Sequence, residues 1–170
     1  MSHAALLDSG SDHRFRQLIQ DMLAFSTRLH AIREEFGRMA GISGSQYSLI
    51  IAIAHLGAAE AGITVTQLAA GLHVSGTYVT AETNKLEQAG YVRRSPNPRD
   101  RRSVLLTVTD PGLKLLDRLL PTIQRVNDQI FQGLSRTEFE TLQRVMSRLA
   151  HSAADALALA EAYGRVGAGP

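Results

Sequence analysis

The segment from Thr64 to Thr109 constrains the fold of this chain more than any other part of the sequence. Gln67 lies three residues after Thr64, the spacing at which two such side chains cap the start of a helix reciprocally. Leu68 and Leu72 then follow at helical spacing. These residues predict a short helix that starts just after Thr64.

A second helix is predicted from Gly76 to about Ala89. Residues 73–75 supply a tight turn before it, and the Ser75 hydroxyl can accept backbone N–H groups of its first turn. Gly90 suits the end of the helix. Helical spacing predicts an inner face that packs in the core, made of Val79, Thr83 and Leu86.

The outer face of this second helix is small, polar and positively charged. It consists of Thr77, Thr80, Ala81, Asn84 and Lys85. In a DNA major groove, hydroxyls of this kind reach phosphates or bases, Asn can read adenine, and Lys can contact guanine or phosphate. An ordinary solvated helix face looks the same, so this helix by itself leaves both interpretations open.

The residues after the second helix favour DNA binding. Two segments rich in β-branched residues, 91–95 and 103–109, flank a turn at 96–100 and predict a hairpin. Five arginines and one acid between Tyr91 and Arg102 give a net charge of +4, whereas the whole chain carries +2. An Arg-rich hairpin beside a major-groove helix can reach the neighbouring minor groove. Asp100 is expected to pair with Arg101 or Arg102 and to brace the hairpin.

The order and spacing of these residues resemble the MarR family of bacterial regulators. The resemblance covers about residues 15–160 and rests on Leu68-Ala69, Val79-Thr80, Leu86-Glu87, Gly90-Tyr91-Val92, Asp100-Arg101-Arg102, Leu106-Thr107, Thr109 and Gly112. It implies a homodimeric repressor on a pseudo-palindromic double-stranded DNA operator, with the second helix in the major groove and a wing arginine in the minor groove. The chain departs from the family pattern at Ala81, where many relatives carry a basic residue, and at Gly76-Thr77-Tyr78.

The residues expected to contact DNA come from the helix-turn-helix and the wing. They are Ser75, Thr77, Tyr78, Thr80, Asn84, Lys85, Arg99, Arg101 and Arg102. Two alternatives stay open: a winged-helix module that binds another protein, or a transcriptional activator without a small-molecule effector. The charge of the wing favours DNA.

Long apolar stripes outside the winged segment predict a dimer. Apolar side chains recur at three- and four-residue steps within 15–39, 113–134 and 142–163. A monomer would leave much of these stripes exposed, although a closed monomeric bundle is the alternative. Asp110 is expected to be the N-cap of the first C-terminal helix, with Pro111 in its first turn, and Pro121 is expected to bend that helix. Ser135 with Glu138 is expected to cap the last helix.

The expected fold is mainly α with a small β-wing, an α+β class in which a winged helix-turn-helix core is flanked by long N- and C-terminal dimerisation helices. The expected division is a flexible N-terminus at 1–12, an N-terminal dimerisation helix at 13–44, the DNA-binding domain at 45–109, C-terminal dimerisation helices at 110–163 and a flexible tail at 164–170.

The family resemblance also implies an effector pocket between the dimerisation helices and the winged domain. Its ligand would be an aromatic carboxylate, a phenol or, as in some regulators of aromatic catabolism, an aromatic coenzyme A thioester, and binding would release the DNA. The candidate lining residues are His30, Arg33, Phe36, Tyr47 and Ile51. Arg33 could pair with a carboxylate and Tyr47 could stack or hydrogen-bond. A purely structural role is the alternative for each.

Composition excludes several other classes. The chain has no cysteine, which rules out disulfides, zinc–cysteine sites and thiol-based sensing. Its six histidines lack metal-ligand spacing, and it has no phosphate-binding glycine loop or nucleophile elbow, so no enzyme, metal or cofactor is expected. The longest apolar stretch, near 49–59, is too short to span a membrane, and the N-terminus does not resemble a signal peptide. The expected location is therefore the bacterial cytoplasm.

Overall fold

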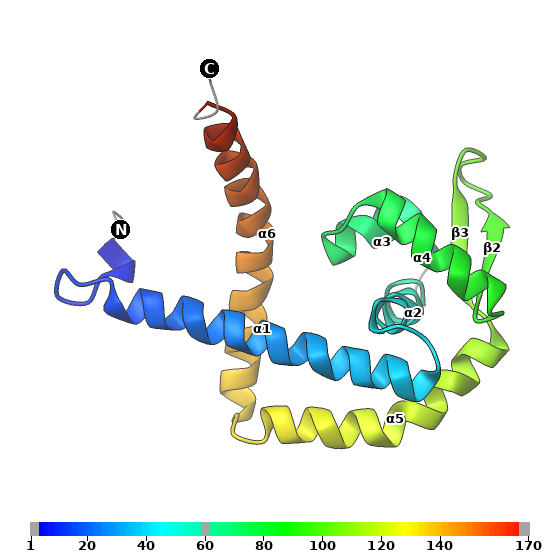
Figure 1. The fold of residues 1–170 in the computed structure, drawn as a ribbon, viewed down its shortest axis with the longest axis horizontal. Helices are drawn as coiled ribbons and strands as arrows, with labels where there is room; N and C mark the ends of the chain where they lie inside the picture. Colours follow the sequence, from blue (N-terminus) through cyan, green and yellow to red (C-terminus); the bar gives the residue numbers. More distant parts are fainter. Residues whose placement is uncertain (1–3, 59–61, 167–170) are drawn as a thin grey trace. The chain divides into compact units, whose positions relative to one another are not determined.

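The computed structural model describes residues 4–58 and 62–166 and confirms a mainly helical fold with one small sheet (Figure 1). The elements are η1 (Ala4–Leu6), α1 (His13–Ala40), α2 (Gly44–Leu56), β1 (Ile63–Thr64), α3 (Val65–Leu72), α4 (Gly76–Gln88), β2 (Val92–Pro96), β3 (Val104–Val108), α5 (Asp110–Phe131) and α6 (Arg136–Val166). The two helices and the hairpin predicted between Thr64 and Thr109 are α3, α4 and the β2–β3 wing.

The chain divides into two compact units at Pro121, residues 1–121 and 122–170. This boundary lies inside α5, at a residue whose ring cannot donate the backbone hydrogen bond of a helix interior. The first unit therefore holds α1 and the first half of α5 together with the winged helix-turn-helix, and so extends beyond the predicted domain of 45–109. In the second unit, the rings of Phe131 and Phe139 meet edge to face across the turn between α5 and α6, with centroids 6.1 Å apart.

The core of the first unit is built around α2. This helix contacts α1, α3, α4 and β3, and Leu49, Ile50 and Ile53 are at most 2% exposed. An apolar surface on every side is typical of a helix that is covered all round. Among the described residues, no single helix is long and apolar enough to cross a membrane, and α1 with α2 meets that requirement only as a pair bent by 88°.

The α1 helix is shorter than the predicted 13–44. It ends at Ala40, because Gly41 adopts a left-handed conformation (φ 73°) and its N–H turns back to the Arg38 carbonyl. Residues 41–43 form the corner before α2. There the Ser43 hydroxyl accepts the Gln46 N–H, and the Gln46 side-chain carbonyl accepts the Ser43 N–H. This reciprocal cap starts α2.

The α1 and α2 backbones approach closely at Gly37 and Gly44. A Cβ atom on Gly37 would lie 2.6 Å from the Gly44 nitrogen and 2.6 Å from the Ser43 carbonyl carbon. On the same side, the Glu34 carboxylate accepts the Gly44 N–H at 3.1 Å. The two glycines and this hydrogen bond fix the angle between the helices.

The sheet has the order β1-β3-β2 and is antiparallel throughout. Val92 lies opposite Val108 and Pro96 opposite Val104, which gives the predicted wing. The third strand, β1, was not predicted. It pairs Ile63 with Leu106, and a two-residue strand is too short to show an alternating pattern in the sequence.

The start of α5 differs from the prediction. Thr109, rather than Asp110, is in the capping position: its hydroxyl accepts the Gly112 N–H at 3.3 Å and donates to the Gly90 carbonyl at 2.5 Å. Asp110 is the first residue of the helix. This contact joins the end of α4 to the start of α5, because Gly90 directly follows α4.

The ends of the chain also differ in part. The predicted cap of α6 is present, with the Ser135 hydroxyl and N–H both donating to the Glu138 carboxylate, and these hydrogen bonds lower the pKa of Glu138. The helix continues to Val166, so 164–166 are helical rather than part of a flexible tail. Within the predicted flexible N-terminus, Ala4–Leu6 form a 3₁₀ turn. Residues 1–3 and 167–170 lie outside the described residues.

Replacing Gly37 by Ala should destabilise the first unit. The new methyl group would meet backbone atoms of residues 43–44 at 2.6 Å, and overpacking of this kind costs about 1–3 kcal/mol. Urea denaturation should show a lower midpoint with an unchanged slope. Gly76→Ala is the control, because its Cβ would have only a Val65 methyl at 4.0 Å nearby and alanine favours a helix over glycine. An unchanged midpoint for Gly37→Ala would contradict this prediction, because it would show that the backbone at 43–44 moves aside at little cost.

Candidate nucleic-acid interface

The rotation of α4 about its axis is fixed by its buried side. Val79, Thr83 and Leu86 are each 0% exposed, as predicted. At the start of the helix, the Ser75 hydroxyl accepts the Tyr78 N–H at 3.1 Å, and at its end Gly90 adopts a left-handed conformation (φ 77°). The helix is therefore capped at both ends. Because one of its sides is buried, only the opposite face is open to a ligand.

That outer face contains most of the helix residues predicted to contact DNA. Thr77, Tyr78, Asn84 and Lys85 are exposed, while Thr80 is partly buried on the side of the wing. Ser75 is exposed, with its oxygen used for the cap. The prediction omitted Gln88, which is exposed and lies four residues after Asn84 on the same stripe. Helical spacing extended by one turn would have found it.

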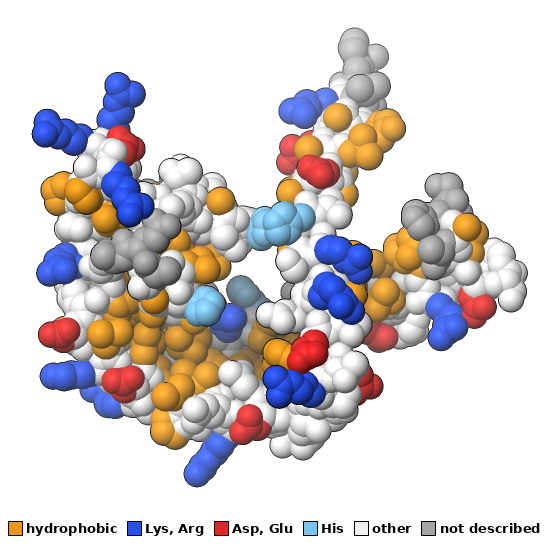
Figure 2. All heavy atoms as spheres, turned by 180° about the vertical axis from the view of Figure 1, so that it is seen from behind, with side chains coloured by type: hydrophobic (Ala, Val, Ile, Leu, Met, Phe, Trp, Pro, Cys, Tyr) orange, Lys and Arg blue, Asp and Glu red, His pale blue; other side chains and the backbone are white. Residues whose placement is uncertain are grey.

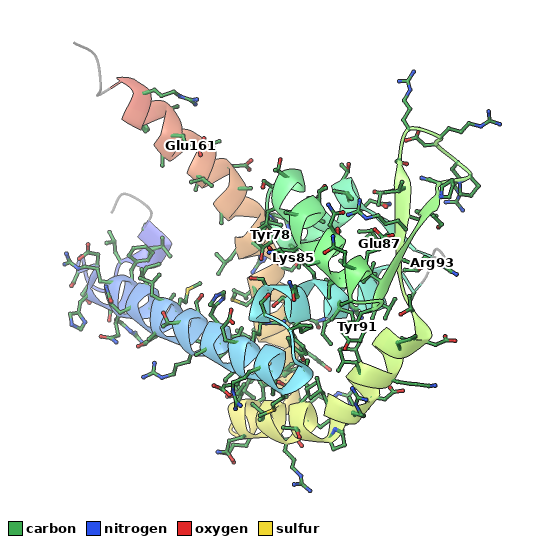
Figure 3. All side chains as sticks on the ribbon, turned by 45° about the vertical axis from the view of Figure 1, so that its right-hand side comes forward. Tyr78, Lys85, Glu87, Tyr91, Arg93 and Glu161 are labelled. Atoms are coloured by element: carbon green, nitrogen blue, oxygen red, sulfur yellow. The ribbon has the colours of Figure 1, made fainter. Side chains whose placement is uncertain are left out.

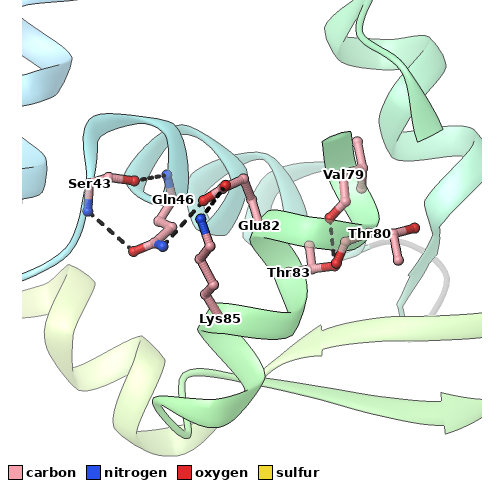
Figure 4. Close-up of polar contacts among 7 residues, drawn as sticks. All are labelled: Ser43, Gln46, Val79, Thr80, Glu82, Thr83 and Lys85. Carbon is pink, nitrogen blue, oxygen red and sulfur yellow. Dashed lines mark hydrogen bonds and ion pairs between the residues drawn. The ribbon is translucent and has the colours of Figure 1, made fainter. Parts of the chain in front are cut away.

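Lys85 is paired within the protein. Its ammonium lies 2.7 Å from the Glu82 carboxylate, which also accepts a hydrogen bond from the Gln46 amide at 3.2 Å (Figure 4). Since Gln46 caps α2 with its other amide atom, this chain of contacts joins the start of α2 to the outer side of α4. One lysine and two glutamates give α4 a net charge of −1. The helix itself is therefore not a basic surface.

Positive charge is concentrated on the wing. Arg99, Arg101 and Arg102 are exposed at its turn, and Figure 2 shows basic side chains at the far end of the hairpin. Asp100 braces this turn through the backbone, because its carboxylate accepts the Arg102 N–H at 3.0 Å. The side chain of Asn97 adds two hydrogen bonds, from the Arg99 N–H at 3.0 Å and to the Ser103 hydroxyl at 2.9 Å.

A pocket of about 550 Å³ lies in the first unit. Three of the residues predicted to line an effector site line it: His30, Arg33 and Ile51. The guanidinium of Arg33 donates to the Ser48 hydroxyl at 3.5 Å, and His30 lies 3.9 Å from the Glu34 carboxylate. Other residues around it come from α2, α3 and α4, among them His55, Leu72, Val74 and Tyr78.

Phe36 and Tyr47 were wrongly placed in this pocket by the sequence. They are 5% and 3% exposed and pack on each other, with ring centroids 5.4 Å apart, between α1 and α2. They belong to the core, because their side of each helix faces the other helix rather than the pocket. Burial raises the pKa of Tyr47 above its ordinary value, and the positive charge of Arg33 opposes part of that shift.

Comparison with known proteins agrees with this geometry. Residues 40–103, from the end of α1 to the far side of the wing turn, match the model of the MarR family. This segment of the chain is therefore similar to the MarR family. The fold resembles that of a MarR protein from Peptoclostridium difficile DA00132 (TM-score 0.67, 20% identity, 90% of this chain and 94% of that one). It also resembles a MarR/EmrR family transcriptional regulator from Acinetobacter sp. ADP1 (TM-score 0.69, 15% identity, 82% and 96%).

Curated transcriptional regulators match about two thirds of the chain. The regulator PecS of Dickeya dadantii is 29% identical over 108 residues, which is 64% of this chain and 64% of PecS. The transcriptional repressor MprA of Escherichia coli K12 is 28% identical over 117 residues, 68% of this chain and 66% of MprA. The chain thus spans just under two thirds of the length of these relatives. Both are named as transcriptional regulators rather than as enzymes.

The raised pKa of Tyr47 predicts how stability depends on alkaline pH. In the folded chain the phenol keeps its proton longer, so its contribution to stability is complete below about pH 10 and is lost as the pH rises through the raised pKa. Urea midpoints measured at pH 9 and pH 11 should therefore fall more for the wild type than for Tyr47→Phe. Tyr78→Phe, at an exposed position, is the control and should fall as the wild type does. An equal loss in Tyr47→Phe would contradict the assignment.

Proposed function

We propose that this chain is a transcriptional repressor that binds a pseudo-palindromic DNA operator as a homodimer and is released by a small aromatic ligand. One observation carries the proposal: a single compact unit contains both α4 and the wing. The helix is capped and has a small polar outer face, and the hairpin has an arginine-rich turn. The names of the curated relatives, among them a transcriptional repressor, support it.

In the proposed complex, α4 lies in the major groove. The exposed side chains of its outer stripe are Thr77, Ala81, Asn84 and Gln88. None of them is bulky, so the helix can approach the base edges. Asn and Gln side chains can read adenine, and Thr can bond to phosphates. Because Lys85 is held by Glu82 at 2.7 Å, we assign it a phosphate contact at the edge of the groove rather than a base contact.

The wing supplies the electrostatic attraction. Arg99, Arg101 and Arg102 stand at the end of a braced hairpin that extends beyond α4 (Figure 1). Such arginines suit the minor groove next to the major-groove site, where the negative potential is strong. Asp100 holds the turn by its backbone contact and so limits how far these side chains can move.

Exposed apolar side chains support a homodimer. In the first unit, Leu18, Leu23 and Phe25 of α1 are 46–58% exposed, and in the second unit Leu157, Leu159 and Tyr163 of α6 are 57–70% exposed. Large apolar surfaces of this kind mark association sites. Two copies related by a two-fold axis would read two half-sites, which is the origin of a pseudo-palindromic operator.

The effector is proposed to occupy the pocket lined by His30, Arg33 and Ile51. A volume of about 550 Å³ suits a small organic ligand, and the Arg33 guanidinium can pair with a carboxylate. Tyr78, in the first turn of α4, lines the same pocket. A ligand there would contact the helix directly and would release DNA by binding preferentially to a conformation that cannot dock.

The alternative function is a winged-helix module that binds a protein, and its specific support is the net charge of −1 on α4. The same fold serves both purposes. Fluorescence anisotropy with the DNA upstream of the chain's own gene, across a salt series and with unrelated duplex as competitor, separates them. Saturable binding of two chains per site that resists the competitor supports the repressor. Equal loss of binding with either DNA supports the protein-binding module.

Replacing Arg101 and Arg102 by Ala should weaken DNA binding across sequences. If both neutralise phosphate charge, the slope of log affinity against log salt should fall by about one to two units per subunit. The double variant Arg14→Ala with Arg16→Ala removes the same charge from exposed positions at the start of α1 and should leave the slope unchanged. Equal slopes for the wing variant and the wild type would make these two arginines structural.

The effector proposal predicts that a panel of benzoate-type acids, phenols and aromatic coenzyme A thioesters contains a compound that weakens DNA binding. Ile51→Trp should fill the pocket and remove the response to that compound, while DNA binding without ligand stays unchanged. Gln20→Trp, at an exposed polar position of α1, is a control for the added indole. A panel without any effect would overturn the effector while leaving the DNA-binding proposal intact.

A further inference from the structure

We infer that Arg94 is a positioning residue that fastens the wing to α4, so that the helix and the hairpin meet DNA at one fixed angle. The inference rests on the proposed function for its effect on DNA binding, but the contact itself can be measured without DNA. Arg94 was counted in the charge of the wing and was not among the residues expected to contact DNA.

The guanidinium of Arg94 runs along one side of α4. Its Nη2 donates to the Thr83 hydroxyl at 2.6 Å and to the Thr80 carbonyl at 3.3 Å, and its Nε lies 3.4 Å from the Glu87 carboxylate. Thr80, Thr83 and Glu87 are spaced by three and four residues, so one side chain spans two turns of the helix. A rigid, planar guanidinium can hold such a set of partners at the same time.

Thr83 makes this contact costly to break. It is the one buried polar residue found in the described part of the chain, and its hydroxyl donates to the Val79 carbonyl at 2.7 Å while it accepts from Arg94. Among the described residues, the Arg94 guanidinium is the donor to the Thr83 oxygen, and at 0% exposure water does not reach that oxygen. Removal of Arg94 would leave an acceptor of Thr83 without that charged donor in the interior.

The strand determines which arginine makes the contact. Successive side chains of a strand point to opposite faces, so Arg93 is exposed while the side chain of Arg94 is only 21% exposed. In the backbone, Arg94 pairs with Leu106, a fully buried residue of β3. Figure 3 shows Glu87 on α4 and Arg93 on β2 where the helix and the wing meet. The contact therefore lies at the middle of the β2 strand, away from the turn of the wing.

Charge supports the same role. Arg94 faces one of the two glutamates of α4, as Lys85 faces the other. With these two acids engaged, the side of α4 that approaches DNA presents less negative charge to the phosphates. Arg94 is thus directed to the protein rather than to DNA, and its substitution should change geometry without removing a phosphate contact.

The main test replaces Arg94 by Lys, which keeps the charge but loses the planar set of donors. DNA affinity for the upstream duplex should fall by about tenfold, with the salt slope unchanged because the net charge is unchanged. Arg93→Lys is the matched control on the exposed face of the same strand and should stay within about twofold of the wild type. Wild-type affinity in Arg94→Lys would overturn the inference, as would a reduced salt slope, which would identify a phosphate contact.

A second pair of variants tests the acceptor. Thr83→Val keeps the volume and removes the hydroxyl, whereas Thr83→Ser keeps the hydroxyl. Thr83→Val should weaken binding as Arg94→Lys does, the two together should cost no more than either alone, and Thr83→Ser should bind as the wild type. Additive losses in the double variant would overturn the coupling. Circular dichroism and urea midpoints identify any variant that fails to fold. If Thr83→Val fails to fold, Arg94→Lys and its control Arg93→Lys test the inference, and if Arg94→Lys fails, Thr83→Val and Thr83→Ser test it.

Amide hydrogen exchange of the chain without DNA separates this inference from the proposed function. Exchange at 92–96 and 104–108 should be at least about fivefold faster in Arg94→Lys and in Thr83→Val than in the wild type or Arg93→Lys. If the wild type does not bind DNA at all, the proposed function fails while this comparison still tests the contact. Equal exchange in all variants would overturn the contact, whatever the DNA result.

Discussion

Burial of one side of α4 is the constraint on which the other features of the winged unit depend. Val79, Thr83 and Leu86 have no exposed surface, so the helix cannot rotate without exposing all three, and exposure of apolar side chains is costly. This fixes the stripe of Thr77, Asn84 and their neighbours towards the outside. The sheet, α2 and α3 supply the apolar surface against which that inner side packs.

Polar contacts then fix α4 on its two flanks. On one flank the Glu82 carboxylate joins the Lys85 ammonium to the Gln46 amide, and through it to the start of α2. On the other flank Arg94 reaches from the wing to Thr83 and Glu87. Both acids of the helix are thereby engaged, and exposed positive charge is concentrated at the turn of the wing.

Local signals in the sequence predicted much of this arrangement. The caps at Thr64, Ser75 and Ser135 predicted where helices begin, and the spacing of Val79, Thr83 and Leu86 predicted the buried side of α4, because capping and amphipathic spacing depend only on residues within a few positions. The start of α5 was placed one residue late for a tertiary reason. Thr109 takes the cap because its hydroxyl also bonds to Gly90, nineteen residues earlier.

Periodicity, caps and charge are properties of short segments, so they were enough to predict the helix-turn-helix, the wing and the face that each turns outward. Which side chains meet across elements became visible only in the folded chain. The tertiary structure placed Phe36 with Tyr47 in the core rather than in the pocket, paired the two-residue strand at Ile63 with Leu106, and turned Arg94 towards Thr83 rather than towards solvent. The physical reason is that burial and hydrogen-bond partners depend on packing between segments far apart in the chain, which no local pattern records.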